Sequence, residues 1–363
     1  MGLTKWMRKL IFLTDRQTAG RILSYLGKFI LAGIVAVLIL SIIFAGYYLV
    51  PLRVDNPDKN TDYKWEPNSI WVRMEEGLSV GKYDANGFNN AEVVDNPDVL
   101  ILGSSHMEAV NVSQHQNTGY YLSQMLNGKL SVYNMGISGH TFAKICQYLP
   151  QTMQVYEAAP KYIVLETSGT AISEKEAQSI MDQTVPKTSV NHNALLNLLQ
   201  KSPFFRVMYY QLDGGLIKKL SDTDSGQTTS GVKADNTESI SKEVDRTPYS
   251  EIFEYLQNIQ DEYNTTIIIM YHPTEKLNSD GTVTYPQEET YKVFSDEAKA
   301  HGLTFVDTTD AFITMHKEDY KLPHGFINGK LGEGHLNGNG HYAVAQSLSE
   351  AIMNIEEAKD ADH

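Results

Sequence analysis

Residues 99–106 read VLILGSSH, four apolar residues followed by a glycine and two serines. A short run that is apolar throughout is typical of a parallel strand buried on both faces. The glycine that follows allows the backbone to turn sharply, and a serine on such a turn can present its hydroxyl at the start of the next helix. The stretch therefore predicts a buried strand that ends in a polar turn.

Similar apolar runs recur along the chain and alternate with segments compatible with helices. The other candidate strands are residues 130–133, 162–165, 266–271 and 304–306. The candidate helices are residues 117–127, 142–157, 286–301 and 340–357. Alternation of buried strands with helices predicts an α/β domain of three layers built on a parallel sheet.

The predicted α/β domain covers residues 99–357 and carries a long insertion, residues 171–250. The insertion contains helix-compatible pieces at 193–201 and 204–212. These are followed by residues 221–245, which are rich in Ser, Thr, Asp, Asn and Gly. That composition predicts a flexible loop. The piece at 204–212 is apolar enough to be either a core helix or a docking surface.

A second feature lies well before the domain: residues 29–50 form an uncharged apolar run of 22 residues. As a helix the run spans about 33 Å, enough to cross a hydrocarbon core of about 30 Å. Residues 1–28 carry six Lys and Arg side chains against one acid, whereas the whole chain has a net charge of −14. The pattern predicts a membrane-spanning helix preceded by a cytoplasmic basic segment.

Two other interpretations of residues 29–50 remain, a buried core helix and a cleavable signal peptide. A core helix of this length normally has a polar face. A signal peptide has a shorter apolar region that ends at a small-residue cleavage site, whereas this run ends in Tyr-Tyr-Leu-Val-Pro. We therefore expect an uncleaved single-pass anchor in the cell membrane, with the N-terminus in the cytoplasm and residues 51–363 outside.

Residues 51–98, between the anchor and the domain, are polar and aromatic and contain four prolines. They predict a juxtamembrane lead-in with room for a strand or two. Residues 358–363 form a short tail.

The chain has a single cysteine, which excludes an intramolecular disulfide and any multi-cysteine metal site. Its pI near 5.2 argues against binding nucleic acid through phosphates.

Three polar loops follow candidate strands or precede the last helix. The first contains Ser104 and Ser105, the second is residues 134–141 (NMGISGHT), and the third is residues 332–341 (GEGHLNGNGH). Because the carboxyl ends of parallel strands form one edge of a sheet, these loops are expected to meet. There His335 can accept the proton of a serine hydroxyl, with Glu333 holding the imidazole in the useful tautomer.

Other histidines suggest a metal site at first sight, but no pair has ligand spacing such as H-E-x-x-H. These histidines are His106, His140, His272 and His341. We therefore expect neither a metal nor a cofactor. His106 and His140 adjoin the first two loops and are expected to line the pocket. Asp307, after the last candidate strand, is interpreted as a turn or helix-capping residue.

In order and approximate spacing, the three loops resemble the sequence blocks of the SGNH/GDSL hydrolase superfamily, over about residues 99–352 outside the insertion. The resemblance implies a flavodoxin-like sheet with strand order 2-1-3-4-5 and a serine acyl-transfer mechanism. By motif, Ser105 is the nucleophile, Gly139 is the oxyanion-hole glycine and His335 is the base. The Ser105 amide is a further oxyanion donor, and Ser104 and Asn337 line the pocket.

The sequence departs from the family pattern at three positions. Ser104 stands where an aspartate is usual, as in membrane-anchored relatives. The third family block normally supplies an asparagine to the oxyanion hole, but residues 165–170 offer only Thr170 or Ser168. The aspartate expected three residues before the histidine is a glycine, so Glu333 is taken as its substitute. Loss of one oxyanion donor typically costs about 3–4 kcal/mol unless it is replaced.

Three functions fit these features. The single anchor and the first block resemble the membrane-anchored proteins that accompany membrane-bound O-acyltransferases in alginate O-acetylation and teichoic-acid D-alanylation. The first function is therefore transfer of an acyl group, acetyl by preference, to or from a cell-surface glycan, with such an acyltransferase as partner. The second is a surface carbohydrate esterase. The third is a catalytically silent partner that binds a glycan or docks to an acyltransferase.

Overall fold

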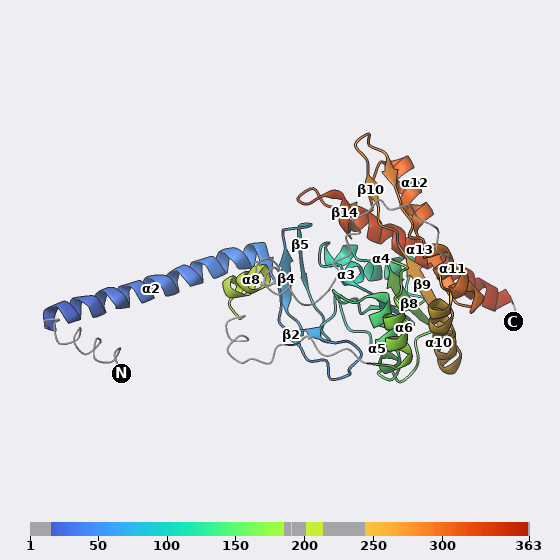
Figure 1. The fold of residues 1–363 in the computed structure, drawn as a ribbon, viewed down its shortest axis with the longest axis horizontal. Helices are drawn as coiled ribbons and strands as arrows, with labels where there is room; N and C mark the ends of the chain where they lie inside the picture. Colours follow the sequence, from blue (N-terminus) through green and yellow to red (C-terminus); the bar gives the residue numbers. More distant parts are fainter. Residues whose placement is uncertain (1–15, 185–189, 191–200, 213–243, 362–363) are drawn as a thin grey trace.

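The computed structural model describes residues 16–184, 190, 201–212 and 244–361. Its centre is a parallel sheet of five strands in the order β12-β9-β8-β6-β7 (Figure 1). The strands are β6 (Val99–Leu102), β7 (Val132–Asn134), β8 (Tyr162–Thr167), β9 (Thr266–Tyr271) and β12 (Thr304–Asp307). Numbered along the chain, this order is 2-1-3-4-5, so the predicted parallel α/β sheet is confirmed.

Helices cover both faces of the sheet because side chains alternate along each buried strand. Leu100 and Leu102 belong to one buried cluster, whereas Val99 and Ile101 belong to the other. The first cluster packs under α5 (Phe142–Met153), α6 (Glu174–Met181), α10 (Thr247–Tyr263) and α11 (Tyr291–Ala300). The second packs under α4 (Thr118–Met125), α12 (Thr309–Asp319) and α13 (Gly338–Ala361).

The lead-in is built into the core of the α/β domain. It contributes the short strands β1 (Tyr48–Leu49), β2 (Arg53–Val54), β3 (Lys64–Trp65), β4 (Ile70–Arg73) and β5 (Ser79–Lys82). Trp65, Trp71 and Tyr83 are buried in the same cluster as strand β6. Strands β4 and β5 form an antiparallel hairpin. Its turn, residues 74–78, contacts Asn328 at the polar edge of the domain, the edge where the carboxyl ends of the sheet strands and the polar loops lie.

The carboxylate of Glu108, at the end of α3 (Ser105–Glu108), joins the lead-in to the domain. This side chain is 1% exposed and accepts hydrogen bonds from Trp65 Nε1 at 2.5 Å and Tyr83 Oη at 2.6 Å. It also accepts one from Ser138 N at 2.7 Å. A buried carboxylate requires such donors, so one residue holds the lead-in and the second polar loop against α3.

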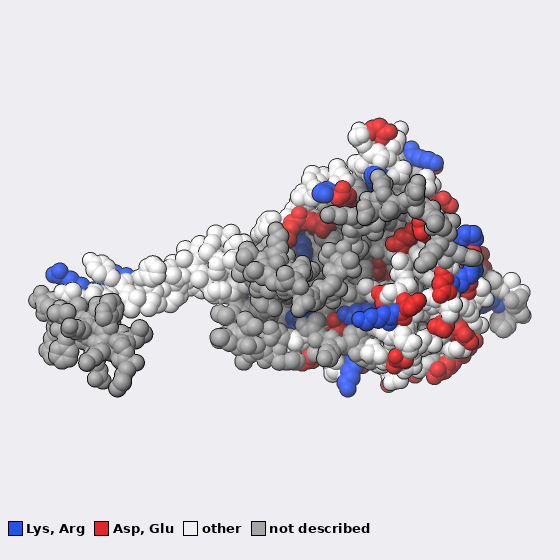
Figure 2. Space-filling view, in the orientation of Figure 1, with Lys and Arg blue, Asp and Glu red and all other residues white. Residues whose placement is uncertain are grey.

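A long helix, α2 (Arg16–Tyr47), projects from the globular part at the end opposite α13 (Figure 1). Its segment Gly20–Tyr47 is long and apolar enough to cross a membrane, and its most apolar window has no buried residue. In Figure 2 this helix is a largely uncharged rod, whereas acidic and basic side chains are mixed over the globular part. An exposed apolar helix of this length suits a lipid surround.

The insertion contributes α8 (Pro203–Leu212), which packs beside the C-terminal end of α2, next to the globular part. The rings of Phe44 and Phe204 are 6.0 Å apart, and the Ser41 and Ser202 hydroxyls are 2.7 Å apart. The helix expected at 204–212 therefore exists, and it packs on the apolar helix instead of on the sheet. The helix expected at 193–201 and the loop expected at 221–245 fall largely outside the described residues.

The remaining strands form two small hairpins above the polar edge of the sheet (Figure 1). Strand β10 (Lys276–Leu277) pairs with β11 (Val283–Thr284), and β13 (His324–Gly325) pairs with β14 (Leu331–Leu336). Strand β14 places the third polar loop of the sequence beside α3.

Candidate active site

Ser105 is the first residue of α3, directly after the turn that follows β6. The Ser104 side chain caps this helix by accepting a hydrogen bond from His106 N at 3.2 Å. As the first residue of a helix, Ser105 has an amide that finds no partner within the helix. Gly103 is required at the turn, because a Cβ there would lie 2.3 Å from Met107 Cγ.

A chain of hydrogen bonds runs from Ser105 through His335 to Glu76. Ser105 Oγ lies 3.0 Å from His335 Nε2, and His335 Nδ1 lies 2.8 Å from Glu76 Oε2. The other oxygen of Glu76 accepts a hydrogen bond from His335 N at 2.8 Å. A carboxylate only accepts, so Nδ1 carries the proton and Nε2 is left to accept from the serine hydroxyl.

Glu76 reaches His335 because it lies on the turn of the β4–β5 hairpin. The next residue, Gly77, has φ +83°, and a Cβ there would lie 2.0 Å from Asn111 O. Asn111 Nδ2 donates to Glu76 O at 2.8 Å, and Gly77 N donates to Asn328 Oδ1 at 3.0 Å. The lead-in thus supplies an acid whose backbone is fixed from two sides.

Glu333, the acid expected beside His335, lies elsewhere. Its carboxylate is 2.9 Å from Lys330 Nζ, and its side chain is 61% exposed. Gly332 and Gly334 on either side have φ +75° and +86°, so the backbone departs from regular strand geometry here. The structure therefore does not bring Glu333 to the His335 imidazole. Glu76 lies instead at the place beside His335 Nδ1 that was expected for Glu333. No local pattern in the sequence marks Glu76, which precedes His335 by 259 residues.

The surroundings of Glu76 favour its charged form. Partial burial raises the pKa of this carboxyl, but hydrogen bonds from the His335 side chain and backbone, with the charge of that ring, outweigh burial. The net effect is a lowered pKa. The carboxylate is therefore ionised at neutral pH and able to hold His335 in the tautomer described above.

Replacing Gly334 by alanine is expected to displace this acid. A Cβ at Gly334 would lie 2.2 Å from Glu76 Oε1, and φ is +86°. If Glu76 orients His335 in ester cleavage, the rate on a p-nitrophenyl ester should fall at least about tenfold, since misplacing such a group by about 1 Å can lower a rate about 10²-fold. Gly128→Ala is the matched control: φ there is +73° with nothing near the added Cβ, so equal loss of activity in both variants would contradict the account.

The second polar loop lies against the nucleophile turn, as the sequence predicts. Ile137 N donates to Gly103 O at 2.9 Å, and Ser138 N donates to Glu108. Gly139 has φ +87° and open space where a Cβ would be. Thr170 is engaged elsewhere: its amide and hydroxyl donate to Glu288 Oε2 at 2.6 and 2.9 Å. The structure therefore leaves Gly139 as a candidate oxyanion donor and directs the donors of Thr170 away.

His140 is 6% exposed and joins the second loop to the lead-in. Its Nε2 lies 2.8 Å from Asp62 Oδ1, and Lys144 Nζ lies 2.7 Å from the other oxygen. Burial raises the pKa of Asp62, but hydrogen bonds and charges from His140 and Lys144 lower it to about 2. Burial lowers the pKa of His140. This histidine is therefore a structural contact between two segments.

Asp62 is expected to make stability depend on acid pH. Because the pKa of Asp62 in the folded chain, about 2, lies below its usual value of 3.8, its contribution to stability is present above about pH 4 and is lost as pH falls toward 2. Asp62→Asn should lower the free energy of unfolding by about 2 kcal/mol at pH 7. Urea unfolding from pH 7 to pH 2 measures this. A difference from wild type that stays constant over that range, or an equal loss in the exposed control Asp58→Asn, would contradict it.

Three further predicted residues have structural contacts. Asn337 Nδ2 donates to Leu322 O and Gly325 O, and its Oδ1 accepts from Asn339 N at the start of α13. His106 Nδ1 accepts from Leu336 N at 3.3 Å. Asp307 Oδ1 accepts from Thr309 N at the start of α12, as expected of a turn residue.

A buried carboxylate–histidine pair, which no sequence pattern had indicated, lies behind the turn that carries Ser105. Glu166, at the end of β8, is 1% exposed and accepts a hydrogen bond from Ser104 N at 2.6 Å. Its other oxygen lies 2.8 Å from Nε2 of His272, which follows β9 and is fully buried. A carboxylate at the end of an otherwise apolar strand is the sequence signal that could have identified this pair.

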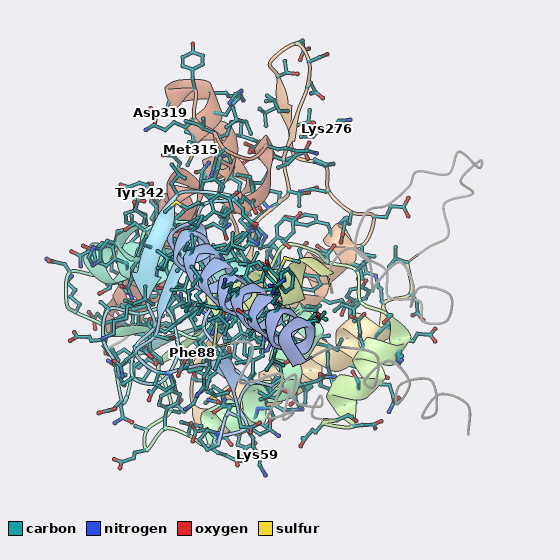
Figure 3. All side chains as sticks on the ribbon, turned by 90° about the vertical axis from the view of Figure 1, so that its left-hand side faces the viewer. Lys59, Phe88, Lys276, Met315, Asp319 and Tyr342 are labelled. Atoms are coloured by element: carbon teal, nitrogen blue, oxygen red, sulfur yellow. The ribbon has the colours of Figure 1, made fainter. Side chains whose placement is uncertain are left out.

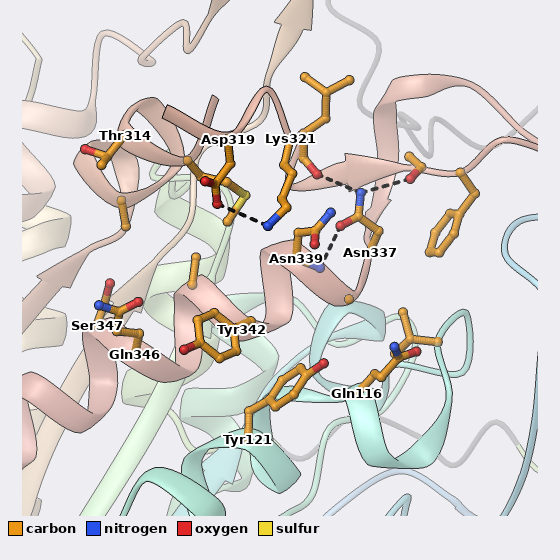
Figure 4. A pocket seen from close by; sticks show the side chains of 18 of the residues that line it. Gln116, Tyr121, Thr314, Asp319, Lys321, Asn337, Asn339, Tyr342, Gln346 and Ser347 are labelled. Atoms are coloured by element: carbon orange, nitrogen blue, oxygen red, sulfur yellow. Dashed lines mark hydrogen bonds and ion pairs between the residues drawn. The ribbon is translucent and has the colours of Figure 1, made fainter. Parts of the chain in front are cut away.

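A groove of about 1650 Å³ begins beside the Glu76 hairpin and runs between α4, α12 and α13. Its walls include Gly77, next to Glu76, and Asn337, two residues after His335. Figure 4 shows Tyr121 and Tyr342 facing the groove, and their ring centroids are 5.4 Å apart. In Figure 3, Met315, Asp319 and Tyr342 mark the same side of the molecule, with Lys276 on the neighbouring hairpin.

Comparison with solved structures gives distant similarities. An α/β hydrolase from the metagenome of Lake Arreo, LAE5, is 14% identical, with a TM-score of 0.37 over 70% of this chain and 93% of its own. The acetylxylan esterase Axe2 from Geobacillus stearothermophilus is 16% identical, with a TM-score of 0.36 over 70% of this chain and 93% of its own. No protein-family model matches the sequence. No curated protein matches it either.

Proposed function

We propose that this chain is a membrane-anchored serine acyltransferase or esterase that acts on O-acyl groups, acetyl by preference, of a cell-surface glycan. The observation that supports it best is the hydrogen-bonded chain Ser105–His335–Glu76. A hydroxyl within reach of an imidazole that is itself oriented by a carboxylate is the arrangement that activates serine for acyl transfer.

The proposed reaction has two steps. In the first, Ser105 Oγ attacks the ester carbonyl of the donor, and its proton passes to His335 Nε2. The leaving alcohol takes that proton, and the acyl group stays on Ser105 as an ester. In the second, a sugar hydroxyl or water gives its proton to His335 and attacks the ester carbonyl of the acyl-enzyme. The bond to Ser105 Oγ then breaks, and His335 returns the proton to Ser105 Oγ. Glu76 keeps the imidazole oriented and stabilises its charged form in both steps.

The negative charge that develops on the carbonyl oxygen needs hydrogen-bond donors. The amide of Ser105, at the first position of α3, is available to it. The amide of Gly139 is the second donor that we propose, because its loop packs on the nucleophile turn. The amide of Ser104 is already bound to Glu166. Glu166 therefore holds the turn and leaves the oxyanion to the other two amides.

The long groove supports a glycan as the substrate. Its lining includes Gly77, next to Glu76, but not Ser105 or His335, so the groove would hold sugar units beyond the one that carries the acyl group. It presents tyrosine rings together with carboxylates and with amides such as Gln116, Asn339 and Gln346. Flat rings can pack against the apolar faces of sugars, while amides and carboxylates hydrogen-bond their hydroxyls. A polysaccharide chain also suits an open groove better than an enclosed pocket.

The apolar helix supports action at the membrane surface. Helix α2 leads directly into the lead-in that carries Glu76. The basic residues among residues 1–28, which precede the uncharged run 29–50, favour a cytoplasmic N-terminus and a domain outside the cell. An anchored enzyme meets a membrane-bound acyl donor at high effective concentration, so a membrane-bound O-acyltransferase is the partner that we propose.

The direction of the reaction is tested with the full-length chain in detergent. The chain is incubated with p-nitrophenyl acetate and an unacetylated surface oligosaccharide, and the products are analysed by mass spectrometry. A transferase yields acetylated oligosaccharide, whereas an esterase yields free acetate. Neither product should form with Ser105→Ala. If the folded wild-type chain forms neither product although the cellular acylation phenotype requires the chain, the silent-partner hypothesis is favoured.

A further inference from the structure

Three histidines from separate elements converge behind the nucleophile turn. They are His106 on α3, His272 after β9 and His324 on β13. One ring nitrogen from each lies within 4.8 Å of the other two. The ring centroids of His106 and His272 are 4.5 Å apart. Because the three positions are far apart in sequence, no spacing motif marks them.

The hydrogen bonds of His272 leave one nitrogen without a partner. Its Nε2 faces the Glu166 carboxylate at 2.8 Å, so Nε2 carries a proton. In the neutral ring Nδ1 then holds a lone pair, and no hydrogen bond to it is present among the described residues. The residue is fully buried. A buried acceptor without a donor is unfavourable, and a metal ion would satisfy it.

His324 gives the same indication more strongly. The residue is 2% exposed, and neither of its ring nitrogens has a hydrogen-bond partner among the described residues. Its Nδ1 lies 3.8 Å from the buried Glu275 carboxylate, too far for a hydrogen bond. A buried imidazole whose nitrogens both lack a partner is unfavourable, and a metal ion bound to one of them would satisfy it.

The buried carboxylate of Glu166 behind His272 is a separate observation that points to a cation. Its side chain is 1% exposed, and its partners are a backbone amide and the His272 ring. Because His272 Nε2 donates to this carboxylate, Nδ1 on the other side of the ring is left to bind a dication. Carboxylate–histidine–metal arrangements of this kind are common around protein metal sites.

We propose that His106, His272 and His324 bind one divalent transition-metal ion, with Zn²⁺ the best match. Three imidazoles suit a tetrahedral ion that keeps a fourth position for water or another ligand. Among the described residues, the His106 ring makes one hydrogen bond, which its Nδ1 accepts from Leu336 N at the long distance of 3.3 Å. A metal ion bound to the ring would replace this weak contact. Because Glu166 also binds Ser104 N, the ion would brace the turn that carries Ser105.

This proposal is independent of the proposed reaction, because His335 and Ser105 are not among the ligands. The ion's role is to hold the turn, and the acyl-transfer steps do not pass through it. The same measurements on Ser105→Ala therefore test the metal site whether or not the chain is an enzyme.

The test uses the full-length chain in detergent, purified with a histidine-free tag, stripped with chelator and checked for folding by near-ultraviolet circular dichroism. Zn²⁺ affinity is measured by competition with a chromophoric chelator, and Co²⁺ coordination by visible absorption. We expect one Zn²⁺ per chain and tetrahedral Co²⁺ bands in wild type and Ser105→Ala. His324→Gln should lose both signals, and the exposed control His115→Gln should keep them.

Glu166→Gln keeps all three ligands and removes the carboxylate behind one of them. We expect its Zn²⁺ affinity to fall about 10–100-fold, the usual effect of losing such a partner. If His324→Gln does not fold, the Zn²⁺ affinity of Glu166→Gln decides whether the three histidines bind a metal ion. The proposal is overturned if the folded wild-type chain binds no Zn²⁺ or Co²⁺, if folded His324→Gln binds as wild type does, or if Glu166→Gln binds Zn²⁺ with unchanged affinity.

Discussion

Glu76→Gln is expected to lower kcat/KM for ester cleavage by about 10²–10⁴-fold, the range seen when the acid of a serine triad becomes an amide. The amide can place its NH₂ group toward His335 Nδ1, which then has to accept. The proton moves to Nε2, where it faces the Ser105 hydroxyl and prevents the ring from acting as a base. Initial rates on p-nitrophenyl acetate measure the effect.

Glu333→Gln is the matched control for this prediction. Its carboxylate is two residues from His335 in sequence but is exposed and pairs with Lys330. A surface ion pair of this kind contributes little, so kcat/KM should stay within about twofold of wild type. If Glu333→Gln loses activity and Glu76→Gln does not, the acid has been assigned to the wrong residue.

Ser105→Ala is expected to abolish acyl transfer, with a loss of about 10⁵–10⁶-fold in kcat, because no other step can form the acyl-enzyme. Ser104→Ala is the neighbouring control. It removes the hydroxyl that caps α3, which costs about 1 kcal/mol of stability, and should keep activity within about tenfold. Rates and thermal unfolding of both variants separate the two roles. A Ser104→Ala chain that is folded but inactive would move the nucleophile to the other serine.

The central fold could be predicted from the sequence because its strands are buried on both faces. Residues 99–102 and 267–271 are apolar runs, and each forms a strand of the observed sheet. The strand order 2-1-3-4-5 was expected only from the family resemblance, and it is the order observed. The lead-in was harder to interpret. Its strands have only two to four residues each, and Trp65 stands between Lys64 and Glu66, so no periodic pattern predicts that it is buried.

The candidate site could be predicted only where its residues stand in a local pattern. Ser105 comes two residues after Gly103 at the end of a predicted strand, and His335 follows Gly334 in the loop before the last predicted helix. The structure brings Ser105 Oγ and His335 Nε2 to 3.0 Å of each other. Glu76 has no such pattern: it is one of two adjacent acids before a glycine, and only the folded hairpin selects it. Local proximity in sequence favoured Glu333, whereas the positive φ angles of its glycine neighbours turn the chain.

The three histidines of the proposed metal site could not be predicted either, because they stand in no local pattern. His106 and His272 each follow a strand of the sheet, and no pair of histidines has ligand spacing. His324 comes from a hairpin beyond the sheet, and it joins the other two only after β13 pairs with β14. Ligands supplied by three separate elements leave no spacing signature, so hydrogen bonds and burial are what identify the site that we propose.

Whether Ser105 is an activated nucleophile can be tested by fluorophosphonate labelling of the full-length chain in detergent, read by intact mass and peptide mapping. We expect one adduct per chain, located on Ser105, and no adduct in Ser105→Ala or His335→Ala. A folded wild-type chain that takes up no label, or that carries the label on another residue, would contradict the proposal that Ser105 is an activated nucleophile.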